Sequence, residues 1–173
     1  TGNLSAATDF YITGSEPGSL ASGSGTAIEV DGNSQYVDCG NLSTGNSFSF
    51  EGWVNVSNLG AYQTLFGKYN KFITWVPGTG LRFEMRNSTN SGWIGVPQTG
   101  GVAPQINANT WYHLAITFGG SGTTMKIYVD GVLATQTNTI NENAYNPTEI
   151  FTIGRWGSSA SRYASGKFDE VRV

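Results

Sequence analysis

Paired carboxylates on one strand face would be the most direct sign of glycan-cleaving chemistry in this chain. Residues two apart on a β-strand share a face. Some glucanases carry the pattern E-x-D-x-x-E on a strand, where one carboxylate attacks the sugar and another protonates the leaving oxygen. The nearest match begins with Glu29 and Asp31, but Ser34 occupies the third position. The catalytic set is incomplete, and the sequence predicts no enzyme of this kind.

The single histidine, His113, is the other residue that could carry acid–base chemistry. Strand alternation places His113 on the face that points away from the core, and Glu51 has the same outward parity and could meet it there. No G-x-S-x-G turn supports a serine nucleophile. We interpret His113 as structural, with a ligand contact as the alternative.

Aromatic side chains in loops give a stronger functional indication. The chain is 13% aromatic, with 5 tryptophans and 8 tyrosines. An aromatic ring can stack on the C–H face of a sugar, while polar neighbours bind the hydroxyls. We predict ligand contacts from Tyr69, Trp93, Arg155, Trp156, Arg162 and Tyr163. The alternative is that these residues only anchor their loops on the rim of the fold. We assign structural roles to Trp53 and Trp111, with Trp111 in the core.

These loops need a rigid frame, and the sequence predicts antiparallel β-structure for it. Residues 111–118 alternate between two faces, one of them apolar, and residues 125–129 repeat the pattern. A period of two with one apolar face indicates a half-buried strand. Asp130-Gly131 is a strong signal for a hairpin turn. The residues predicted to lie between two sheets are Phe48, Phe50, Leu81, Phe83, Leu114, Ile116, Ile127, Val129 and Ile153.

Composition argues against several other classes of protein. The 173 residues include 24 glycines, as many tight turns require, and only 12% are charged, with a net charge of −3. There is no basic stripe for nucleic acid and no apolar run long enough to cross a membrane, so we expect neither partner. Cys39 is the only cysteine and cannot form an intrachain disulfide. We interpret it as a small buried hydrophobe, with a reactive thiol as the alternative.

Short motifs in a fixed order connect the sequence with a known family. They are AIEVDG at 27–32, FSFEGWV at 48–54, WYH at 111–113, IYVDG at 127–131 and FDEVRV at 168–173. In the same order they resemble "ALxFDG", "FTISAWV", "WYHVA", "LYVNG" and "IDEVRI" of the laminin-G-like domains in the concanavalin A-like lectin and glucanase superfamily. The resemblance runs from residue 27 to residue 173.

The resemblance implies an all-β fold, a two-sheet antiparallel β-sandwich of the jelly-roll kind, over a single domain at 1–173. Related glucanases hold a structural calcium ion with an aspartate on the last strand and carbonyls of the N-terminal segment. Asp169 matches that aspartate, so a calcium cofactor is expected there; a hydrogen-bonded Asp169 is the alternative. The family does not fix a function, because such folds carry many.

We therefore expect a non-catalytic carbohydrate-binding or adhesion module that recognises a glycan or glycoprotein surface. The alternative is a structural or protein-interaction domain, such as a spacer or decoration domain, without a glycan ligand. A surface poor in charge and rich in Ser, Thr and Asn is typical of extracellular, cell-surface and virion proteins. The chain starts at Thr1 without Met, so we expect a piece of a larger multidomain or multimeric assembly.

Overall fold

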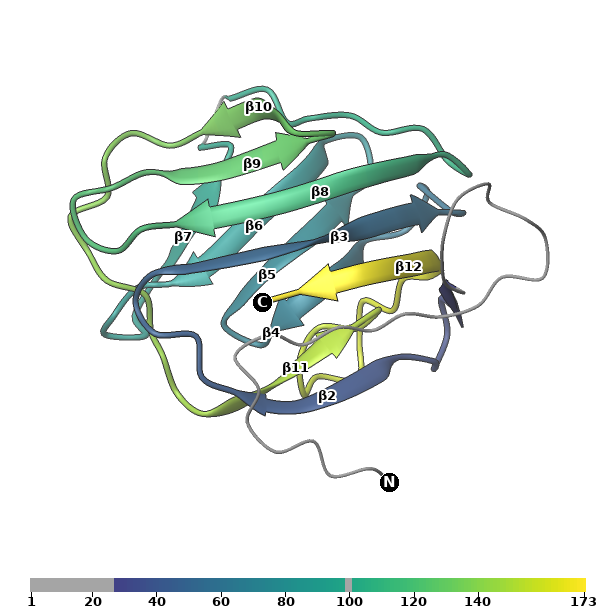
Figure 1. Ribbon diagram of the computed structural model, residues 1–173, viewed down its shortest axis with the longest axis horizontal. Helices are drawn as coiled ribbons and strands as arrows, with labels where there is room; N and C mark the ends of the chain where they lie inside the picture. Colours follow the sequence, from purple (N-terminus) through teal and green to yellow (C-terminus); the bar gives the residue numbers. More distant parts are fainter. Residues whose placement is uncertain (1–26, 99–100) are drawn as a thin grey trace.

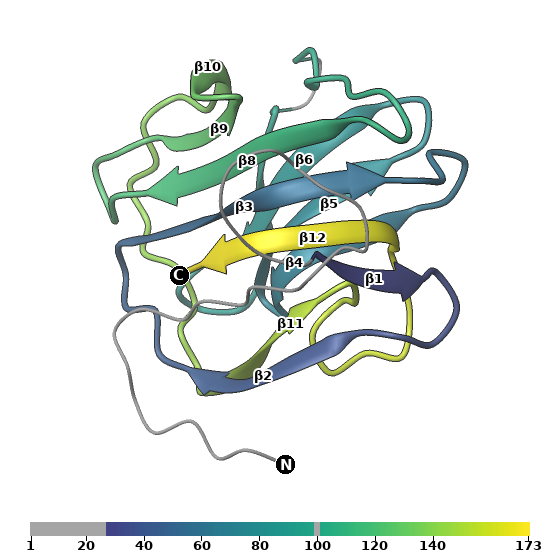
Figure 2. The ribbon, with the colours of Figure 1, turned by 45° about the vertical axis from the view of Figure 1, so that its right-hand side comes forward.

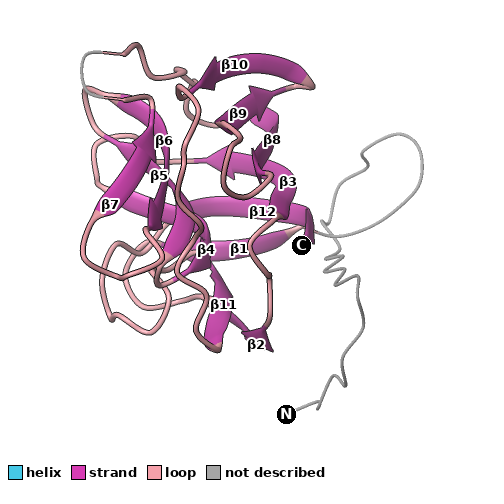
Figure 3. Cartoon of the chain, turned by 90° about the vertical axis from the view of Figure 1, so that its left-hand side faces the viewer, coloured by secondary structure: helices cyan, strands magenta, loops and turns pink. Residues whose placement is uncertain are grey.

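The computed structural model describes residues 27–98 and 101–173, which form two antiparallel six-stranded sheets packed face to face (Figures 1 and 3). The front sheet of Figure 1 has the order β1 (Ile28–Asp31), β12 (Ser165–Arg172), β3 (Phe48–Val56), β8 (Trp111–Phe118), β9 (Met125–Val129) and β10 (Val132–Gln136). The back sheet has the order β2 (Val37–Leu42), β11 (Glu149–Ile153), β4 (Gln63–Lys68), β5 (Lys71–Val76), β6 (Gly80–Arg86) and β7 (Trp93–Val96).

The predicted two-sheet antiparallel β-sandwich is thus confirmed. Within the described ranges there is no helix, and hence none long and apolar enough to cross a membrane. Figure 2 shows β1 and β12 side by side, so the first and last described strands close one edge of the front sheet. Residues 1–26 of the predicted domain lie outside the described part.

The core follows the predicted alternation. In β3 every second residue is buried, and β3 pairs with β8 so that Phe50 lies opposite Ile116. Eight of the nine residues predicted between the sheets are buried, and Val129 is half-buried and packs against them. The Asp130-Gly131 turn joins β9 to β10 with positive φ at both residues, 50° and 78°, as a type I′ hairpin requires.

The prediction that Trp111 lies in the core is wrong. Its side chain is half-buried and lies outside the hydrophobic core, because it shares a strand face with His113 rather than with Leu114. Trp53, which we assigned a structural role, is 39% exposed on the same outer face. Cys39 is half-buried against the core, and burial raises the pKa of its thiol to about 12, which favours the unreactive form.

Strands β4 and β5 depart from simple alternation, because nearly all of their residues are buried. Ile73 faces the core, whereas Phe72 is fully buried but lies outside the core cluster, on the opposite face of the back sheet. A second layer of side chains must therefore cover the outer face of the back sheet at these two strands. Trp156 of the segment 154–164 and Trp93 of β7 both contact Phe72 edge-on and belong to that layer.

Two lysines are also buried, at the turn between β4 and β5, where Lys68 pairs with Lys71. Their ammonium groups donate hydrogen bonds of 2.8–3.1 Å to four acceptors: Lys68 to the carbonyls of Leu42 and Pro147, and Lys71 to Thr44 Oγ1 and Asn146 Oδ1. Burial, together with the neighbouring Lys68, lowers the pKa of Lys71 to about 7. Burial also raises the pKa of Glu149, whose Oε2 is buried without a hydrogen-bond partner.

Candidate functional site

The segment 154–164 lies against the turn between β4 and β5 because Gly157 allows a very close approach. Its φ is +46°, and a Cβ atom there would lie 2.5 Å from the backbone N and Cα of Tyr69. Only glycine fits this position without displacing the backbone. Two backbone hydrogen bonds tie the segment to β4, from Gly154 N to Leu65 O at 2.7 Å and from Thr64 N to Arg162 O at 2.9 Å.

The close approach brings together a group of rings that we call the back-face aromatic cluster, made of Tyr62, Tyr69, Phe72, Trp93 and Trp156. Trp156 stacks on Tyr69 with centroids 4.8 Å apart and planes 12° apart, and its Nε1 donates to Tyr69 O at 2.8 Å. It also meets Phe72 edge-on at 5.7 Å and lies 6.4 Å from Trp93. Trp156 is therefore the centre of the cluster.

Two arginines lie on the rings of this cluster. The guanidinium carbon of Arg86 is 4.1 Å from the centroid of Trp93. That of Arg162 lies 4.1 Å from Tyr62 and 4.0 Å from Trp156. Such cation–π contacts fix the planar guanidinium and leave its edge free to donate hydrogen bonds. Arg162 has a φ of +56°, which is uncommon for a non-glycine residue and is often found at functional sites.

A cavity of about 420 Å³ lies beside Trp93 on the same face. Its polar lining comes from Arg82, Glu84 and Gln98, and Arg82 forms a 3.3 Å ion pair with Glu84. Trp93 is 41% exposed, the most open ring of the cluster. An open tryptophan next to a carboxylate, a guanidinium and an amide supplies both the stacking surface and the hydrogen-bonding groups that a sugar ring can use.

The structure brings four of the six predicted ligand contacts together, namely Tyr69, Trp93, Trp156 and Arg162. It separates Arg155 and Tyr163 from them. Arg155 is buried, with its guanidinium carbon 3.5 Å from the ring of Tyr36 and its Nε donating to Gly157 O at 2.9 Å. Tyr163 lies 6.4 Å from the same Tyr36 ring. These two residues hold the segment 154–164 in place from its other side.

Sequence reasoning missed five residues of this face: Tyr62, Phe72, Arg82, Glu84 and Arg86. The alternation of side chains between the two faces of a strand could have identified all of them except Tyr62. Phe72 alternates with Ile73, and the three charged residues of β6 alternate with apolar residues that face the core. Nothing in the local sequence indicates that Tyr62, which precedes β4, reaches Arg162.

The outer face of the front sheet carries a second group of polar side chains. His113 Nε2 lies 3.9 Å from Glu51 Oε2, so these two residues, which share outward parity, do meet on this face. Trp53 meets the His113 ring edge-on at 5.4 Å. Arg172 forms ion pairs with Glu51 at 3.2 Å and with Glu170 at 2.8 Å. Arg172 thus contacts both carboxylates and ties β12 to β3 on this face.

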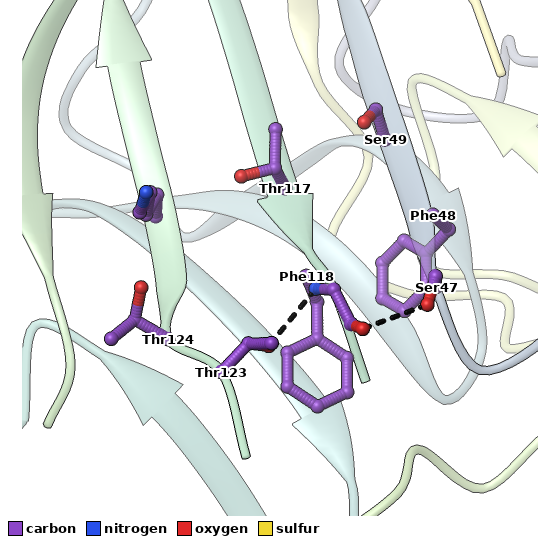
Figure 4. A pocket seen from close by; sticks show the side chains of 9 residues that line it. Ser47, Phe48, Ser49, Thr117, Phe118, Thr123 and Thr124 are labelled. Atoms are coloured by element: carbon purple, nitrogen blue, oxygen red, sulfur yellow. Dashed lines mark hydrogen bonds between the residues drawn. The ribbon is translucent and has the colours of Figure 1, made fainter. Parts of the chain in front are cut away.

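The same face has a hollow of about 530 Å³ at the ends of β3, β8 and β9, lined by hydroxyl groups and Lys126. Figure 4 shows the hydroxyls of Ser49, Thr117 and Thr124 on its surface, while the rings of Phe48 and Phe118 point away into the core. Ser47 and Thr123 bond the backbone of Gly119 at 2.8 and 3.1 Å. No exposed ring lines this hollow, so it offers a sugar no stacking surface.

Asp169 lies on β12 opposite Trp53, and its Oδ1 accepts a 2.8 Å hydrogen bond from the amide of Glu170. Within residues 27–98 and 101–173, no group of three or more His, Cys, Asp or Glu side chains is arranged to hold a metal ion. Calcium takes six to eight oxygen ligands, and much of the N-terminal segment expected to supply some of them lies outside the described residues. Calcium at Asp169 therefore stays a prediction.

That prediction is tested by thermal unfolding with EDTA and with millimolar calcium. A hundredfold excess of calcium over its dissociation constant would stabilise the folded state by about 2.7 kcal/mol. For a domain of this size the midpoint would rise by about 5–10 °C. Asp169→Asn should abolish the rise. Equal midpoints in EDTA and calcium would rule the site out.

Comparison with known proteins identifies the family to which this chain belongs. The sequence profile of the laminin-G-like group, described as the concanavalin A-like lectin/glucanases superfamily, matches residues 31–173. The chain therefore belongs to this superfamily. No curated protein was found to match the sequence.

Solved structures show the same fold at low sequence identity. Domain 4 of AbnA, an extracellular arabinanase of Geobacillus stearothermophilus solved with arabinotriose, is 22% identical, with a TM-score of 0.64 over 96% of this chain and 75% of that one. The sialidase module CBM40 of Ruminococcus gnavus, bound to α2,3-sialyllactose, is 11% identical, with a TM-score of 0.56 over 84% and 87%. A pentraxin of Limulus polyphemus is 13% identical, with a TM-score of 0.60 over 84% and 73%.

Proposed function

We propose that the protein is a non-catalytic carbohydrate-binding module whose ligand lies on the back-face aromatic cluster. The observation that carries this proposal is Trp93, an open ring supported by Arg86 and bordered by the polar cavity that contains Arg82 and Glu84. A sugar stacked on Trp93 would have donors and acceptors within its reach. The arabinanase and sialidase modules, which share this fold, were solved with oligosaccharides bound.

The rival function is a spacer or protein-interaction domain without a glycan ligand. Tyr69 and Trp156 support it in part, because both are half-buried and hold the segment 154–164 on the sheet. Trp93 favours binding instead. A ring needed only to anchor a loop would be covered, yet Trp93 remains 41% exposed beside an open cavity.

The site also favours binding over catalysis. Glycoside hydrolysis needs two carboxyl groups about 5–10 Å apart on either side of the bond that is cleaved. Among the described residues that line the cavity, Glu84 is the one carboxylate, and Arg82 pairs with it at 3.3 Å. A single carboxylate held by a guanidinium is suited to accepting hydrogen bonds from sugar hydroxyls.

A module of this kind would act on extracellular, cell-surface or virion-surface glycans, as part of a larger multidomain or multimeric assembly. One shallow site binds weakly, with dissociation constants from about micromolar to millimolar, or about −8 to −4 kcal/mol. Several copies in one assembly would multiply that affinity without any new contact.

A glycan array with the purified protein tests the proposal. We expect binding to a restricted set of glycans, and we expect mass spectrometry to recover those glycans uncleaved after prolonged incubation. Failure to bind any member of a broad array would favour the spacer function. Cleavage that disappears in Glu51→Gln or His113→Ala would show instead that the front face is an active site.

A further inference from the structure

The charge on the back-face site is opposite to that of the whole protein. The chain has 9 basic and 12 acidic residues, a net charge of −3. The aromatic cluster and its cavity nevertheless hold three guanidiniums, from Arg82, Arg86 and Arg162, against the single carboxylate of Glu84. The site therefore has an excess of two positive charges in a protein that is otherwise acidic.

Two of these guanidiniums are without a carboxylate partner within the described parts of the chain. Arg82 pairs with Glu84, and on the front sheet Arg172 pairs with Glu51 and Glu170. Arg86 and Arg162 form no ion pair with residues 27–98 or 101–173, and each is instead stacked on a tryptophan. Cations that are fixed in orientation but not neutralised are prepared to bind an anion.

Arg86 also has one donor that the described residues leave without an acceptor. Its Nε is buried and has no hydrogen-bond acceptor. Leaving a buried donor unsatisfied is costly, and the large majority of such groups in folded proteins have a partner. The same side chain covers one face of Trp93, the ring that borders the cavity. An acidic group at the edge of a sugar stacked near Trp93 would lie close to this guanidinium.

We propose that the site binds carboxylate-bearing sugars, with the ring against Trp93 and the carboxylate on the guanidiniums of Arg86 and Arg162. This inference rests on the proposed glycan-binding function and narrows its ligand class. A planar guanidinium matches a carboxylate with two parallel hydrogen bonds, a geometry that a neutral hydroxymethyl group cannot reproduce. Hexuronic acids and sialic acids share this chemistry, and the test separates them.

The test compares three ligands by calorimetric titration of the intact protein: an oligouronate, the same oligosaccharide with its carboxyl groups reduced to hydroxymethyl, and a sialylated trisaccharide. We expect at least one acidic ligand to bind, and carboxyl reduction or removal of the sialic acid to weaken binding about tenfold or more. Binding should also weaken as salt is raised, because the ion pair is partly exposed.

Single-residue variants show which arginines bind the carboxylate of the sugar. Arg162→Gln and Arg86→Gln should each lower affinity for the acidic ligand about tenfold more than they lower affinity for a neutral glycan. Arg172→Gln, on the front sheet, should change neither. Thermal unfolding shows whether Arg162→Gln and Arg86→Gln are folded. If one of them is not, the binding data of the other test the proposal. Equal binding of acidic and neutral sugars would overturn this inference and leave the proposed function standing. Binding of neither would overturn both.

Discussion

Between pH 7 and pH 9 the free energy of unfolding is expected to rise by about 2 kcal/mol, because the buried Lys71 loses its proton in the folded state first. Its pKa of about 7 lies below the ordinary lysine value of 10.5. Between these two values the unfolded chain binds a proton that the folded protein does not. Stability therefore increases with pH in this window, and the slope ends below pH 7, where both states are protonated.

Chemical unfolding at pH 7, 8 and 9 measures this slope. Lys71→Met keeps most of the side-chain volume, removes the titrating group and should abolish most of the slope, although Lys68, whose pKa burial also lowers, can retain part of it. Lys126→Met, on the outer face of the front sheet, is the matched control and should keep the slope. The measurements stop at pH 9 because burial raises the pKa of Cys39 to about 12. Above pH 9 the unfolded chain loses the thiol proton that the folded protein keeps, so this group lowers stability as pH rises. A flat profile, or an unchanged slope in Lys71→Met, would contradict the assignment.

Replacement of Trp156 by alanine is expected to lower both stability and glycan affinity. The substitution removes the stack on Tyr69, the edge contact with Phe72 and one of the two rings that hold Arg162. Removing a large buried aromatic side chain costs about 3–5 kcal/mol, and half-burial of Trp156 reduces the expected loss to about 2–3 kcal/mol.

Unfolding curves and binding titrations of Trp156→Ala and Trp156→Phe test this role. The phenylalanine variant retains a ring against Tyr69 but loses the hydrogen bond from Nε1 to the Tyr69 carbonyl. It should recover more than half of the lost stability and part of the affinity. If Trp156→Ala unfolds at the same denaturant concentration as the wild type, the ring does not anchor the segment 154–164, and the description of the cluster is wrong.

The strands were predictable because one face of each borders a single core. The alternation at 111–118 and 125–129 and the Asp130-Gly131 turn identify β8, β9 and the hairpin to β10 without any long-range information. The same reasoning fails for β4 and β5. Their outer face is covered by a segment almost 90 residues later in the sequence, and the Trp156–Tyr69 contact has no local signal.

The sequence indicated which kinds of residue to consider for the candidate site. It did not indicate which of them lie together in the fold. The search for loop aromatics included Tyr69, Trp156 and also Trp93, which the structure places at the start of β7 rather than in a loop. Arg155, next to Trp156, and Tyr163, next to Arg162, contact Tyr36 instead. The direction of each side chain depends on the left-handed backbone at Gly157 and Arg162, with φ of +46° and +56°. Sequence alone does not determine where such a loop reverses.

A binding titration of two matched tryptophan variants tests the account most directly. Trp93 and Trp53 are 41% and 39% exposed and lie on the outer faces of opposite sheets, so both can be truncated at similar cost to folding. With a glycan found on the array, Trp93→Ala should weaken binding about tenfold or more, a loss of about 1.4 kcal/mol or more, and Trp53→Ala should bind like the wild type. Wild-type affinity in Trp93→Ala together with lost binding in Trp53→Ala would place the ligand on the front sheet and contradict the account.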